Sequence, residues 1–101
     1  MTPRQIARVD NNQTEIVEKL RDAGASILHL HTLGRGSPDI LIGFRNVNLL
    51  VEIKMPDGKL TDDERKFFDG WRGQVTVVRT VEDALRLLDD SWIDWDGAEE
   101  I

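Results

Sequence analysis

The sequence contains no cysteine, which excludes disulfide bonds and thiolate metal sites. It also has no apolar run that approaches the roughly 20 residues needed to cross a bilayer. Residues 1–10 lack the apolar stretch of a signal peptide. We therefore expect an intracellular protein that is located in the cytoplasm and has no membrane partner.

The chain is short, and its 101 residues provide for one domain with one hydrophobic core. The sequence has no internal repeat, low-complexity tract or linker. We expect a single domain over residues 1–88, followed by an acidic tail over residues 89–101. Chains of this size often gain stability from oligomerisation, so we also expect a homodimer.

The net charge of −6 argues against a nucleic-acid partner at first sight, but the acidic residues are unevenly distributed. From Val81 onward the chain has eight acidic residues and one basic residue, Arg86. The rest of the chain therefore has 11 of the 19 acidic residues and 12 of the 13 basic ones. This part is close to neutral, and a bound divalent cation would make its surface positive. The charge weakens a nucleic-acid function without excluding it.

Apolar periodicity, turn residues and caps indicate seven secondary-structure elements. They predict a helix over residues 11–23, strands over 26–30, 39–44 and 49–54, a helix that begins at Thr61, a strand over 74–79 and a helix over 81–88. The second helix begins with a capping box, because Glu64 follows Thr61 by three residues. Strands 39–44 and 49–54 are close enough to form an antiparallel hairpin. The order αβββαβα predicts an α/β fold with a mixed central sheet flanked by helices.

The hairpin strands place chemically active side chains together. Each strand has an alternating apolar set, namely Ile40, Ile42 and Phe44 on the first strand and Leu49, Val51 and Ile53 on the second. If both sets share a face, Asp39, Glu52 and Lys54 share the opposite face. Pairing Asp39 with Glu52 would bring their Cβ atoms to about 5 Å, which is unfavourable for two like charges. A divalent cation such as Mg²⁺ or Mn²⁺ between the carboxylates would stabilise the pair, and Lys54 could orient a water molecule or neutralise phosphate charge.

Residues 36–54, GSPDILIGFRNVNLLVEIK, resemble the core motif of the PD-(D/E)XK nucleases. Pro38-Asp39 and Glu52-Ile53-Lys54 match the two halves of this motif. The wider context is similar to the VRR-NUC branch, which is related to Holliday-junction resolvases and includes small stand-alone phage and bacterial proteins. The resemblance covers residues 11–88 and includes the Gly-Lys-Leu-Thr turn at residues 58–61.

The resemblance implies a restriction-endonuclease-like αβββαβ core and a role for each matching residue. Asp39 and Glu52 would hold the catalytic metal, with the carbonyl of Ile53 as a further ligand. Lys54 would position the attacking water, and Glu15 would reach from the first helix to a second metal or its water shell. Many members of the family have glutamine where this chain has Glu64, and the resemblance implies that this position steadies the lysine or the substrate. Glu64 departs from that pattern and is also well explained as a helix cap.

Two basic residues are candidates for DNA contacts. Arg35 and Lys59 lie in turns that flank the predicted metal site, so we expect them to contact phosphates, although ordinary solvated charges are the alternative. A solvated helix charge is likewise the alternative for Glu15. His29 and His31 share a strand face and could be ligands, but polar strand positions or substrate contacts explain them better.

These observations predict a metal-dependent endonuclease that hydrolyses phosphodiester bonds of DNA and acts on branched structures such as Holliday junctions. One alternative is a catalytically inactive nuclease-fold module that binds DNA or a protein. Another is a metal-dependent hydrolase of a different phosphodiester. The sequence has no evident Ser/His/Asp or Cys/His set and no phosphate loop, which argues against other hydrolytic and nucleotide-binding chemistries.

Overall fold

The computed structural model describes the backbone of residues 3–89 and the side chains of residues 12–89 other than that of His31. The helices and strands of these residues are α1 (Pro3–Asp22), β1 (Ser26–His29), the short 3₁₀ helix η1 (His31–Leu33), β2 (Ile40–Phe44), β3 (Val47–Ile53), α2 (Asp62–Gly70), β4 (Val75–Val78) and α3 (Val81–Asp89). Of the expected acidic tail, Asp89 ends α3, and residues 90–101 lie outside the described residues.

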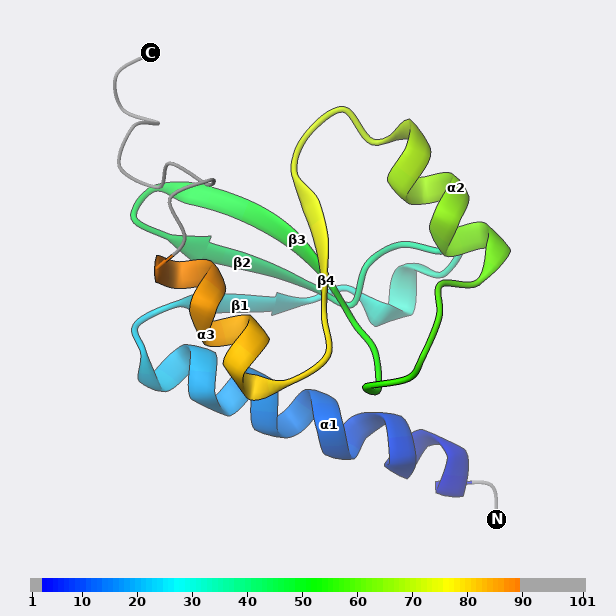
Figure 1. Cartoon of the computed structure of the whole chain (residues 1–101), viewed down its shortest axis with the longest axis horizontal. Coiled ribbons are helices and arrows are strands. Elements are labelled where there is room, and N and C mark those ends of the chain that lie inside the picture. The colour runs from blue at the N-terminus through cyan, green and yellow to red at the C-terminus, as the bar shows by residue number, and fades with distance from the viewer. Residues whose placement is uncertain (1–2, 90–101) are drawn as a thin grey trace.

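The four strands form one mixed sheet in the order β1-β2-β3-β4 (Figure 1). The pairs β1–β2 and β2–β3 are antiparallel, whereas β4 runs parallel to β3. The parallel pair requires a crossover connection, and α2 lies within it. The predicted α/β class and mixed sheet are therefore confirmed.

The hairpin turn between β2 and β3 is shorter than the sequence predicts. Arg45 and Asn46 both have positive φ, at 52° and 68°. Two such residues in succession are typical of the tight type I′ turn, whose twist suits a two-residue connection. Val47 and Asn48, expected in the loop, therefore belong to β3.

Helix α1 begins at Pro3, eight residues before the predicted start. The prediction depended on the apolar stripe that includes Ile16 and Leu20, and the polar residues 10–15 separate this stripe from Ile6 and Val9 in the first turns of α1. Proline is favourable in the first helical position, because its fixed φ suits a helix and its missing N–H would have no partner there.

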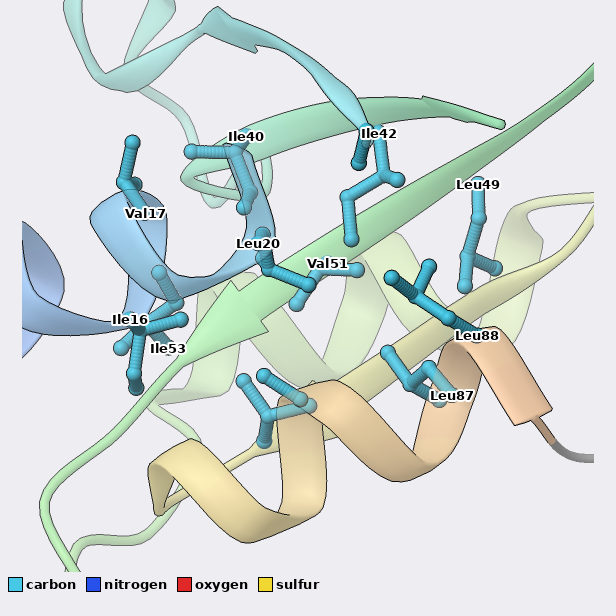
Figure 2. Close-up of a cluster of buried hydrophobic side chains, with 13 residues drawn as sticks. Ile16, Val17, Leu20, Ile40, Ile42, Leu49, Val51, Ile53, Leu87 and Leu88 are labelled. Atoms are coloured by element: carbon cyan, nitrogen blue, oxygen red, sulfur yellow. The ribbon is translucent and has the colours of Figure 1, made fainter. Parts of the chain in front are cut away.

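The hydrophobic core lies between one face of the sheet and the helices α1 and α3, which are on the same side (Figure 1). The two apolar sets of the hairpin point into this layer, as predicted. Figure 2 shows the side chains of this core, which include Ile16, Val17, Leu20, Ile40, Ile42, Leu49, Val51, Ile53, Leu87 and Leu88. No helix among the described residues has the length and apolarity needed to cross a membrane.

The opposite face of the sheet carries both an apolar row and the candidate site. Leu28, Leu41, Leu50 and Val75 are paired in register, so they form a row across all four strands. Leu28 at the edge is 57% exposed. Because side chains two residues apart share a face, Glu52 lies beside Leu50 on this face. Helix α2 stands apart from α1 and α3, beside the segment that contains η1 (Figure 1).

Candidate functional site

A pocket of about 340 Å³ lies where β2 begins and β3 ends. Its walls come from α1, the two hairpin strands, the turn after β3 and the first turn of α2. The lining residues are Asn12, Asp39, Glu52, Ile53, Lys54, Met55, Gly58, Lys59 and Glu64. Three segments far apart in the sequence therefore contribute polar side chains to one cavity.

The carboxylate of Asp39 is fixed by the backbone of β3. Ile40 is paired with Val51, so the register places Asp39 opposite Glu52, as predicted. The amide of Asp39 donates to the carbonyl of Val51 at 3.1 Å, and the amide of Ile53 donates to Asp39 Oδ2 at 2.7 Å. Burial raises the pKa of Asp39 above its ordinary value, and this effect outweighs the opposing hydrogen bond from Ile53.

Glu52 is the buried acid of the site, with only 3% of the residue exposed. Its Oε2 lies 3.6 Å from Nζ of Lys54, and its buried Oε1 has no hydrogen-bond partner among the described residues. Burial, followed by the negative charges of Asp39 and Glu64, raises the pKa of Glu52 to about 9. The isolated chain therefore favours a proton on this carboxyl group at neutral pH.

Lys54 lies between two carboxylates. Its Nζ is 2.7 Å from Glu64 Oε1, and both side chains are mostly buried. Burial alone would lower the pKa of Lys54, but the hydrogen bond and charge of Glu64 outweigh it, so the pKa is raised. For Glu64, burial alone would raise the pKa, but the hydrogen bonds from Lys54 and the Thr61 amide outweigh burial, so the pKa is lowered. Lys54 and Glu64 therefore form a charged pair at neutral pH.

The first turn of α2 brings Glu64 to the pocket. Thr61 caps the helix as predicted, because its hydroxyl accepts from the Glu64 amide at 3.2 Å and its own amide donates to Glu64 Oε1 at 2.9 Å. Gly36 packs against this turn, and a Cβ at Gly36 would lie closer than 3.0 Å to the backbone of Asp63. The turn before Asp39 and the start of α2 are thus in direct contact.

Helix α1 contributes Asn12 to the pocket. The Asn12 side-chain amide donates to the carbonyl of Lys54 at 3.0 Å. Glu15, the residue expected from α1, is exposed and does not line the pocket. Its assignment as a ligand stays a prediction. To contact a cation in the pocket, the Glu15 side chain would have to extend into the pocket from outside its lining.

The structure brings most of the predicted set together. Asp39, Glu52, Ile53, Lys54 and Lys59 all line the pocket. Arg35 does not line it, although its turn is next to Gly36, which contacts the start of α2. The assignment of Ile53 as a carbonyl ligand and of Arg35 and Lys59 as phosphate contacts stays a prediction.

The sequence patterns do not single out Asn12 for the site, and Glu64 enters only through the resemblance, at the position where many members of the family have glutamine. Asn12 precedes the apolar stripe of α1 and has no motif, and Glu64 is explained as a helix cap. The local signal for Glu64 is that a capping-box glutamate folds back toward the residues before its helix. His29 pairs with Gln13, with 3.4 Å between His29 Nδ1 and Gln13 Nε2, and does not line the pocket.

The donor set at the pocket suits one oxygen-preferring cation. Asp39 and Glu52 offer carboxylates from adjacent strands, and the buried Oε1 of Glu52 has an unused lone pair. No group of three His, Cys, Asp or Glu side chains arranged to hold a metal occurs within the described part of the chain. The third carboxylate, Glu64, is already bound to Lys54. A cation here would therefore complete its shell with backbone carbonyls and water.

In comparisons with known proteins, no family model matches the sequence, and no curated protein or solved structure shows significant similarity to the chain.

Proposed function

We propose that this protein is a metal-dependent endonuclease that hydrolyses phosphodiester bonds of DNA. Asp39 and Glu52 would bind Mg²⁺ or Mn²⁺, and Lys54 would be the catalytic lysine. The observation that carries the proposal is that the partly buried Asp39, the buried Glu52 and the Lys54 paired with Glu52 line one wall of a pocket.

The burial of Glu52 supports a cation-binding role for this acid. A carboxylate that is 3% exposed and has one unpartnered oxygen is costly to keep charged without a counter-charge. Lys54 supplies only part of this counter-charge, because its ammonium lies closer to Glu64 than to Glu52. A divalent cation, when bound, would supply Lewis acidity toward water and toward the phosphodiester.

The residues of the chain have separate roles in this proposal. Asp39 and Glu52 bind and orient, because their carboxylates are held by two adjacent strands. Lys54 donates hydrogen bonds from a pocket wall and stabilises negative charge on a phosphate that enters the pocket. Lys59, on the same wall, adds a positive charge for the backbone of the nucleic acid.

The fold and the sequence motif support the nuclease class. The element order from α1 to β4 is that expected for a restriction-endonuclease-like core. The Pro-Asp and Glu-x-Lys segments, which resemble those of PD-(D/E)XK and VRR-NUC nucleases, are the ones that meet at the pocket. By this resemblance we propose branched DNA, such as a Holliday junction, as the substrate.

Cleavage assays test the proposal directly. The wild-type protein is incubated with junctions, flaps, duplexes and single strands in Mg²⁺, Mn²⁺ or EDTA. We expect cleavage only with a divalent cation, and loss of cleavage in Asp39→Asn and Glu52→Gln, with folding checked by circular dichroism. A Glu52→Gln variant as active as the wild type would contradict the assignment.

We also propose that the protein acts as a homodimer. A chain of this length buries only a small hydrophobic core. The exposed Leu28 at the end of the apolar row provides hydrophobic surface that a second copy could cover. Sedimentation velocity of the wild type and of Leu28→Asp measures this directly. A monomeric wild type would contradict the dimer without affecting the site.

A nuclease-fold module that binds without cleaving is the competing function. The observation on its side is the net charge of −6, which disfavours a nucleic-acid substrate and is compatible with a protein partner. Calorimetric titration with Mn²⁺ separates the two, because a binding module has no need of a cation site that depends on Glu52.

A further inference from the structure

Lys54 is held at both ends of the residue by side chains from two different helices. Its carbonyl accepts a hydrogen bond from Asn12 of α1 at 3.0 Å, and its ammonium pairs with Glu64 of α2 at 2.7 Å. Helix α1 is far from β3 in the sequence, and α2 follows β3 after the turn that contains Gly58. The position of the Lys54 ammonium therefore depends on how both helices meet the end of β3.

The backbone at Lys54 needs such support because the strand ends there. Strand β3 ends at Ile53, although the Lys54 amide still donates to the Val78 carbonyl at 3.0 Å. The chain then enters a turn in which the Gly58 amide donates to the Met55 carbonyl. The hydrogen bond from Asn12 holds the carbonyl of Lys54, the residue at which regular strand pairing ends.

We propose that Asn12 is a positioning residue that fixes the backbone of Lys54, so that the ammonium stays between Glu64 and Glu52. This inference rests on the proposed nuclease function and adds a residue of α1 to its machinery. Asn12 acts through Lys54 and not on the cation, because its side-chain amide N–H donates to a backbone carbonyl.

The kinetic test compares Asn12→Ala with Asn12→Gln and with Thr14→Ala, an exposed position on the same helix. The substrate is whichever DNA the wild type cuts, and Mn²⁺ affinity is measured by calorimetry. We expect kcat of Asn12→Ala to fall about 10- to 100-fold, because small misplacements of a catalytic group have effects of this size. KM and Mn²⁺ affinity should stay close to wild type, Asn12→Gln should regain part of kcat, and Thr14→Ala should match the wild type.

Several results would overturn the proposal. Unchanged kcat in Asn12→Ala would show that Lys54 keeps its position without the hydrogen bond from Asn12. A raised KM with unchanged kcat would make Asn12 a substrate contact, and a parallel loss of Mn²⁺ affinity would make it part of the cation site. If Asn12→Ala does not fold, Asn12→Ser also lacks the amide and takes its place under the same criteria.

A second measurement is independent of catalysis. The chain has four lysines, so ¹⁵N-lysine labelling gives a simple spectrum in which Lys54→Arg identifies the Lys54 ammonium. We expect slow proton exchange at this ammonium in the wild type and faster exchange in Asn12→Ala. Equal exchange rates would contradict the positioning role. If the wild type cuts no DNA, the nuclease proposal fails, and the exchange rates still decide the role of Asn12.

Discussion

Nζ of Lys54 lies 2.7 Å from Oε1 of Glu64, and this same oxygen accepts the hydrogen bond from the Thr61 amide that caps α2. One carboxylate oxygen therefore takes part in the N-terminal cap of α2 and also binds the lysine of the candidate site. The capping box is a local motif of four residues, yet here it fixes a contact between segments that are separate in the sequence.

Replacing Lys54 by alanine should remove most turnover and leave cation binding nearly intact. Lys54 stabilises charge and does not ligate the cation, and removal of one such donor costs about 100- to 1,000-fold in kcat. Single-turnover cleavage measures the rate, and calorimetry measures Mn²⁺ affinity. Loss of Mn²⁺ affinity in this variant would contradict the role given to Lys54.

The stability of the protein without a cation should fall as pH rises from about 5 to about 9. The pKa of Glu52 is about 9 in the folded chain against an ordinary value of 4.5, so between these values the folded state holds a proton that the unfolded state releases. The free energy of unfolding then decreases with pH, by at most about 1.4 kcal/mol per pH unit for one such group. The lowered pKa of Glu64 acts only at more acidic pH, where its loss of charge weakens the fold.

Urea denaturation in EDTA across this range measures the effect. Glu52→Gln is the matched control, because it keeps the shape and cannot titrate. We expect a flatter pH dependence in Glu52→Gln than in the wild type, and Mn²⁺ should reduce the loss of stability at high pH in the wild type alone. The same slope in both proteins would show that Glu52 is not the group responsible.

The sequence predicts the parts of the site that depend on strand alternation. Once the apolar sets that include Ile42 and Val51 share a face, the period of the strand places Asp39 and Glu52 on the opposite face, and the length of the turn then decides that they are directly paired. A four-residue turn would pair Phe44 with Leu49, whereas the observed two-residue turn pairs Phe44 with Val47. This shift of two residues keeps every side chain on its predicted face.

The contributions of the helices could not be predicted in the same way. Alternation fixes a face within a sheet, but the contact between Asn12 and Lys54 joins residues that are 42 positions apart. It depends on the angle at which α1 crosses the sheet, which packing of the whole core determines. The same holds for Glu64, since its capping role is visible locally and its contact with Lys54 requires the tertiary fold.

Gly36→Ala should destabilise the protein more than Gly34→Ala. Both glycines have positive φ, at 78° and 71°, so both substitutions strain the backbone, and Gly34, with ψ at −168°, lies in a region that is essentially restricted to glycine. Only at Gly36 would the new Cβ meet the Asp63 backbone, whereas nothing lies within 4 Å at Gly34. Urea denaturation measures the free energy of unfolding of both variants, and a destabilisation of Gly36→Ala no larger than that of Gly34→Ala would contradict a rigid contact between Gly36 and α2.

Lys59→Ala and Arg35→Ala should weaken DNA binding without altering the cation site. Each removes one positive charge near the pocket, so we expect the slope of log K against log salt to fall by about one for each phosphate that the variant no longer neutralises. Fluorescence anisotropy in EDTA, over a range of salt concentrations, measures binding without cleavage. Lys19→Ala is the matched control, since Lys19 is an exposed cation in the last turn of α1 and away from the pocket lining. If Lys59→Ala binds with the same salt dependence as Lys19→Ala, Lys59 is an ordinary solvated charge and the path of the DNA does not cross this wall of the pocket.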